Sequence, residues 1–151
     1  MNQEAPSQYH AARAPHRTLP NPRNADLEDR LTDFAVSVLN VIESLPAGLS
    51  SSHIARRLVR SGTAPAPGYV EATCTPTAPP DGQHLAPVLA DLRESRVWLR
   101  ILWKKAYLPG GLLVVLLREC EELIRLMLAE AHIASGCGKR CDTVEVSPSI
   151  A

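Results

Sequence analysis

Side chains with the chemistry for catalysis or metal binding are few in this 151-residue chain, and they do not gather into a known pattern. Among the four cysteines only Cys137 and Cys141 stand close together, in a segment that contains glycine. A zinc site needs a second Cys or His pair at a matching spacing, and the sequence has none. It also has no HExxH motif, no glycine-rich phosphate loop and no nucleophile elbow. We therefore expect no enzyme activity, no catalytic residue, no bound metal, no cofactor and no small-molecule substrate.

The basic residues form a clearer pattern. Arg93, Arg96, Arg100 and Lys104 are spaced by three, four and four residues, which places them along one face of a helix. One interpretation is a track that binds the phosphates of a nucleic acid. The other is an ordinary solvated helix face, which acidic residues nearby on the same helix favour. The nucleic-acid interpretation uses Arg56, Arg57, Arg60, Arg93, Arg96, Arg100 and Lys104.

Charge is balanced over the chain but not along it. The 16 Lys and Arg residues equal the 16 Asp and Glu residues, so the formal net charge is zero, which argues against a strongly basic nucleic-acid-binding protein. Residues 26–45 and 112–134 are acidic, whereas residues 50–72 and 81–106 are basic. These opposite charges can be satisfied within one subunit or between subunits.

The sequence also bears on location. The N-terminal residues lack the apolar core of a signal peptide, which indicates a reduced, cytoplasmic setting for the cysteines. The longest apolar run, residues 112–117, is far shorter than the roughly 20 residues that cross a bilayer. We expect a cytoplasmic protein that does not bind membranes.

Hydrophobic residues recur with the helical period in four stretches and alternate with period two in none. Asn24 or Asp26 is expected to cap the first helix, and Trp103 is expected on the core face of the third. The second helix must break or kink at Pro65 and Pro67. The four predicted helices span 26–45, from about 50 to the proline break, 81–106 with a start near 86, and 112–134 after a break at 109–111.

These helices predict an all-α fold, an antiparallel up-and-down four-helix bundle over residues 26–134. The 13 prolines fall mainly outside the helices, in the first 25 residues and in a linker at 73–80. Residues 1–25 are predicted to be a disordered arm and residues 135–151 a flexible tail.

One apolar pair does not fit the predicted core. If Leu92 and Leu99 face inward, Val97 and Ile101 point away from the bundle, and Trp98 lies on the edge between the two faces. We interpret this pair as part of a subunit interface. The alternative is that these are ordinary scattered apolar residues on a protein surface.

Three separated segments resemble a known family, the four-helix-bundle proteins encoded by intervening sequences in 23S rRNA genes (S23-like proteins). The family is related to the accessory variability protein of diversity-generating retroelements. Ala64-Pro65 and Pro67-Gly68 depart from the family pattern, within the break already expected. The segments are Arg60-Ser61-Gly62-Thr63 with Gly68-Tyr69-Val70-Glu71-Ala72, then Leu92-Arg93-Glu94-Ser95 with Trp98-Leu99-Arg100, and then Glu121-Glu122-Leu123-Ile124.

The resemblance implies a non-enzymatic bundle that assembles into homopentameric rings. It also implies, through the retroelement relative, a basic surface that binds nucleic acid and a reverse transcriptase. The residues that match the family motif are Arg60, Ser61, Gly62, Thr63, Tyr69, Glu71, Arg93, Glu94 and Ser95. The residues expected at the subunit interface are Tyr69, Glu71, Val97, Trp98 and Ile101.

Two functions follow as hypotheses. The first is a non-catalytic, self-associating bundle that acts as an interaction or accessory module. The second is a nucleic-acid-binding accessory protein, associated with a reverse transcriptase or with rRNA, that uses the basic faces of the second and third helices.

Overall fold

The computed structural model describes residues 22–74 and 82–137, and within these ranges it contains helices and no β-strand. The predicted all-α class is confirmed. The elements are α1 (Pro22–Glu43), α2 (Leu49–Thr63), α3 (Pro65–Cys74), the short 3₁₀-helix η1 (Gln83–Leu85), α4 (Ala86–Lys105) and α5 (Gly110–Cys137).

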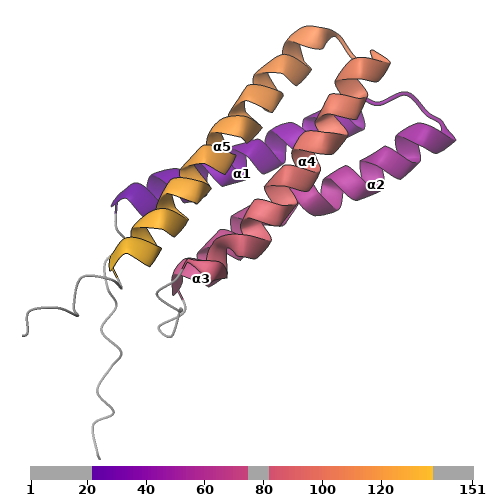
Figure 1. Cartoon of the computed structure of the whole chain (residues 1–151). Coiled ribbons are helices and arrows are strands. Elements are labelled where there is room, and N and C mark those ends of the chain that lie inside the picture. The colour runs from indigo at the N-terminus through magenta and orange to yellow at the C-terminus, as the bar shows by residue number, and fades with distance from the viewer. Residues whose placement is uncertain (1–21, 75–81, 138–151) are drawn as a thin grey trace, which may run out of the picture.

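The helices form the expected antiparallel four-helix bundle, in which α2 and α3 together make one of the four rods. In Figure 1, α4 and α5 lie side by side at the front, α1 runs behind them, and α2 lies next to α4. The rod of α2 and α3 packs on both α1 and α4, and α5 packs on α4 and α1. Each rod therefore buries one face against two neighbours.

The predicted break in the second rod is confirmed, and it is only one residue long. Ala64 separates α2 from α3 with right-handed helical angles (φ −64°, ψ −31°), and the N–H of Gly68 donates to its carbonyl over 3.0 Å. Pro65 and Pro67 have no N–H, so the helical hydrogen bonds that they would donate are missing. Because Ala64 keeps helical angles, the chain nevertheless continues in nearly helical form through the prolines.

Several predicted boundaries were wrong by a few residues. Because α1 begins at Pro22, the last four residues of the predicted arm are helical, and Asn24 and Asp26 lie inside the helix rather than at its cap. Proline is tolerated in a first helical turn, so Pro22 does not delay the start. Helix α5 includes Gly110 at its start and Cys137 at its end, so the first three residues of the predicted tail are also helical. The remainder of the arm, the tail and most of the linker lie outside the described residues.

The core runs along the whole bundle and consists mainly of aliphatic side chains around Phe34. Trp103 is not part of it, and the prediction that it would be was wrong: its side chain is 48% exposed. The facing start of α5 is Gly110-Gly111, which has no side chain to cover the ring. The largest fully buried side chains are Phe34, Leu31, Leu58, Leu92, Leu99, Leu102, Leu113, Leu123, Met127, Val38, Val41 and Val88.

Candidate functional site

Two segments of the family-like motif meet in the interior between α2 and α4. Ser61 and Ser95 are both buried, and the Ser95 hydroxyl donates a hydrogen bond to the Ser61 hydroxyl over 2.9 Å. A buried hydroxyl needs such a partner, because it has left water. These two motif positions therefore join helices rather than face a ligand.

Gly62 brings α2 close to α1. A Cβ atom built on Gly62 would lie 2.6 Å from Cγ1 of Val38, closer than real Cβ contacts. On the far side of the core, the Cys120 thiol of α5 donates to the carbonyl oxygen of Leu92 over 3.3 Å, and burial raises the pKa of that thiol to about 12. Small side chains thus let α2 and α5 approach their neighbours, and Cys120 is held as an unreactive thiol.

Tyr69 was predicted at the subunit interface, and this was wrong. It is a core residue, only 2% exposed, on the inner face of α3. Its burial, followed by the nearby Glu130 and Glu28 carboxylates, raises the pKa of its phenol to about 12. Because the break at Ala64 barely interrupts the rod, the helical spacing from Leu58 carries Tyr69 inward. Glu71, two residues later, is exposed.

Trp98 lies half-buried at the seam between α2 and α4, where three polar side chains hold it. Its indole Nε1–H donates to Oε1 of Glu94 over 3.1 Å, and the guanidinium of Arg57 lies over the ring, 5.9 Å from its centre. Arg57 also forms an ion pair with Glu94 at 3.6 Å, and the ring of His53 meets that of Trp98 edge-on. These contacts hold the Trp98 ring in place at the edge of the outer surface of α4.

Val97 and Ile101 lie on the outer face of α4, as predicted. They are 51% and 39% exposed, and together with Arg100 and Lys104 they line a shallow hollow of about 200 Å³. We call this surface, Val97, Arg100, Ile101 and Lys104, the α4 patch. It combines an apolar centre with two basic side chains.

The basic residues are not all equally available. Arg96 is only partly exposed, with its Nε buried and without a hydrogen-bond partner in the structure, and Arg57 is engaged with Glu94 and Trp98. These residues lie on α2 and α4, which pack against each other. The members with exposed side chains are Arg56, Arg57, Arg60, Arg93, Arg100 and Lys104.

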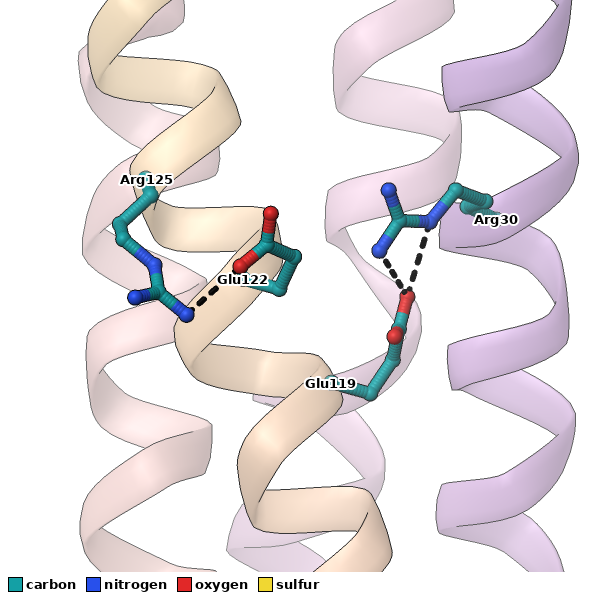
Figure 2. Close-up of polar contacts among 4 residues, drawn as sticks. All are labelled: Arg30, Glu119, Glu122 and Arg125. Carbon is teal, nitrogen blue, oxygen red and sulfur yellow. Dashed lines mark hydrogen bonds and ion pairs between the residues drawn. The ribbon is translucent and has the colours of Figure 1, made fainter.

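A second hollow, between α1 and α5, was not found from the sequence. It has a volume of about 720 Å³ and an apolar floor that includes Phe34, Leu112 and Val115. Charged pairs lie along its rim (Figure 2): Nε and Nη2 of Arg30 donate to Oε1 of Glu119 at 3.1 and 2.9 Å. We call this surface the α1/α5 groove. Its two walls come from helices far apart in the sequence, with Arg30 and Glu119 separated by 89 positions, so no local sequence pattern predicts the groove.

A second pair on the same rim lies within α5. Nη2 of Arg125 meets Oε2 of Glu122 at 2.6 Å, one helical turn away (Figure 2). Both pairs are partly exposed, so water and salt weaken them and each contributes below about 1 kcal/mol to stability. They order the rim of the groove more than they stabilise the fold.

Within residues 22–74 and 82–137, no group of three or more His, Cys, Asp or Glu side chains lies close enough to hold a metal ion. Cys141 of the predicted cysteine pair lies outside these residues. No helix in the described part of the chain is long and apolar enough to cross a membrane.

No protein-family model and no curated protein matches the chain. Among solved structures, the fold is similar to the crystal structure of a protein with unknown function from the S23 ribosomal protein family of Bacteroides thetaiotaomicron. The two share 19% sequence identity with a TM-score of 0.61, over 70% of this chain and 97% of that one. The chain has an S23-like helical fold. At this sequence identity the similarity shows the fold alone, and the function of the Bacteroides protein is itself unknown.

Proposed function

We propose that this protein is a non-catalytic, self-associating four-helix bundle that acts as an interaction or accessory module. The observation that carries the proposal is the α4 patch, where Val97 and Ile101 are exposed one helical turn apart. Burying such a pair against another protein gains about 25 cal/mol per Å² of apolar surface removed from water. Trp98, held beside the α4 patch by Glu94 and Arg57, supplies a rigid aromatic edge of the kind that anchors interfaces.

The proposed assembly is a homo-oligomeric ring in the cytoplasm, with five subunits as the resemblance to S23-like proteins implies. The contact residues proposed for it are Val97, Trp98 and Ile101, with the exposed Glu71 as a further candidate. Tyr69 is left out of the interface because its side chain is already buried within the subunit.

Light scattering coupled to size-exclusion chromatography tests this function. The wild-type protein is expected to have a mass in solution that is a multiple of the 16.4 kDa of one chain. The double variant Val97→Ser/Ile101→Ser is expected to shift towards the monomer, while Leu49→Ser, which removes an apolar side chain that is 90% exposed elsewhere, is expected to behave as wild type. A wild-type protein that stays monomeric at high micromolar concentration would contradict the proposal.

A second candidate function is nucleic-acid binding, because exposed basic side chains lie on the neighbouring helices α2 and α4. A gel-shift titration with labelled RNA and single-stranded DNA at low salt tests it. If phosphates bind here, Arg93→Gln/Arg100→Gln weakens binding and lowers its salt dependence, whereas Arg118→Gln on α5 does neither. Absence of any shift at low salt removes this candidate.

A further inference from the structure

The α1/α5 groove has an apolar floor that the described part of the chain leaves partly open to solvent. Leu112 and Val115 line it and are 49% and 66% exposed. The charged side chains around this floor are balanced, with three Arg residues against three acidic ones, and two Arg–Glu pairs are already formed (Figure 2). The groove therefore favours an occupant that is apolar on one side and carries little charge.

The segment that follows α5 has such a composition. Residues 144–150 read Val-Glu-Val-Ser-Pro-Ser-Ile and contain a single charged side chain. The pattern is too short to predict a strand by itself, but its aliphatic residues are separated by even numbers of positions, so they share one side of an extended chain. Pro148 disfavours a helix here and favours an extended backbone. The aliphatic residues are Val144, Val146 and Ile150.

The segment before α1 offers no comparable apolar side. Besides Met1, residues 1–21 contain only two large apolar side chains, Tyr9 and Leu19, which are ten positions apart. Of the two segments that flank the bundle, only the one after α5 can therefore present several aliphatic groups together.

The apolar side of residues 144–150 is as long as the groove. The α5 wall of the groove extends from Leu112 to Arg125, which is roughly 20 Å at about 1.5 Å per helical residue. An extended chain also covers about 20 Å from Val144 to Ile150, at about 3.3 Å per residue. The aliphatic side chains can therefore contact the floor along its whole length.

The segment also starts within reach of the groove. Helix α5 ends at Cys137, at the same end of the bundle as the start of α1 (Figure 1). The way back along α5 to Arg125 is about 18 Å, and an extended chain from Cys137 to Val144 covers about 23 Å. Gly138 directly follows the helix, and glycine is the residue that most readily reverses a chain at a helix end.

We infer that residues 144–150 dock in the α1/α5 groove of their own subunit, extended and antiparallel to α5, with Ile150 near Leu112 and Val115. A short tether gives the segment an effective concentration on the order of millimolar at the groove, which favours it over a second copy. The inference does not depend on self-association, because it concerns contacts within one chain. A partner that uses the groove must first displace this segment.

Disulfide trapping in the full chain tests the docking. Val115→Cys/Ile150→Cys is expected to form a bond within one chain, in oxidised glutathione, at least tenfold faster than the control Glu121→Cys/Ile150→Cys. Glu121 is exposed on α5, does not line the groove and is nearer to the end of the helix, so chance contact favours the control. Every cysteine except the buried Cys120 is first replaced by serine: Cys74→Ser, Cys137→Ser and Cys141→Ser.

Substitutions in the segment test its apolar side without touching the bundle. Val144→Ser/Val146→Ser is expected to slow trapping to the rate of the control pair. Glu145→Gln/Ser147→Ala, on the other side of an extended segment, is expected to leave the rate unchanged.

Three outcomes overturn the docking within one chain: equal trapping rates for the two cysteine pairs, no effect of the valine substitutions, or a product that joins two chains. Circular dichroism checks that each variant keeps its helices. If Val115→Cys loses the helical signal, Leu112→Cys takes its place in the same comparison, because that side chain is also exposed in the groove.

Discussion

The hydroxyl of Ser95 on α4 donates a hydrogen bond to the hydroxyl of Ser61 on α2, 2.9 Å away in the interior of the bundle. This contact joins two of the three segments in which the sequence resembles S23-like proteins. It gives those segments a role in packing, because neither side chain is accessible to a ligand.

Removing both hydroxyls is expected to lower the free energy of unfolding by less than the sum of the losses from removing each one alone. Ser61→Ala leaves the Ser95 hydroxyl buried without its partner, which destabilises the fold by about 1–3 kcal/mol. The same holds for Ser95→Ala. The double variant Ser61→Ala/Ser95→Ala leaves no buried hydroxyl without its partner, and this is why its loss in the free energy of unfolding is the smaller one. Urea unfolding measures all three, and strictly additive losses would contradict the pairing.

Gly62→Ala is expected to destabilise the bundle although alanine is the better helix former. The added methyl would collide with Val38 at 2.6 Å, and such overpacking costs about 1–3 kcal/mol, against about 1 kcal/mol gained in helix propensity. Val38→Ala in the same chain should restore part of the loss. Gly111→Ala is the matched control, since nothing lies within 4 Å of its added methyl, and it should be neutral or stabilising.

Stability is expected to fall at high pH because of Tyr69. Burial raises the pKa of its phenol from 10.0 to about 12, so the phenol ionises more readily in the unfolded chain than in the folded one. Its contribution is fully present below pH 10 and is lost as the pH rises towards 12. Tyr69→Phe removes this pH dependence. Thermal unfolding of both proteins between pH 9 and 12 measures the difference, and parallel curves would contradict it.

Cys74 and Cys120 are expected to differ in reactivity. The Cys120 thiol is buried, with its pKa raised to about 12, whereas Cys74 is exposed at the end of α3. A thiol reagent at pH 8 should modify Cys74 within minutes and Cys120 only at the rate of unfolding. Mass spectrometry of digested protein distinguishes the sites, with Cys74→Ser as the control. Rapid labelling of Cys120 in the folded state would contradict its placement in the core.

Self-association is expected to weaken with salt. Charges of opposite sign that face each other across a subunit interface are screened over about 8 Å at physiological ionic strength and over about 3 Å at 1 M. Sedimentation velocity from 50 mM to 1 M NaCl should therefore show the oligomer dissociating. An assembly that strengthens or stays constant over this range would be held by apolar contacts alone.

The helices were predictable because their periodicity is local and strong. The period of 3.6 placed Leu31, Phe34 and Leu99 in the core and left Val97 and Ile101 outside, as the structure shows. Helix ends were less predictable, because Pro22 and Gly110 are permitted in a first turn and do not mark where a helix must stop.

The surfaces were harder to predict because they depend on which helices become neighbours. Tyr69 follows a proline break that suggested an end to the rod, yet the backbone at Ala64 stays helical and turns the ring inward. The α1/α5 groove needs Arg30 and Glu119 to meet across the bundle, and nothing in either local sequence shows that they do.

The basic excess of α2 and α4 and the acidic excess of α1 and α5 make the neutral subunit an electric dipole. Near its isoelectric point of about 7.0, a single subunit is expected to adhere both to a cation exchanger, through α2 and α4, and to an anion exchanger, through α1 and α5. In a closed ring the in-plane components of successive subunit dipoles cancel, and the charged surfaces at the interfaces are covered. The assembled form should therefore pass both resins at a salt concentration at which a monomeric variant is still retained.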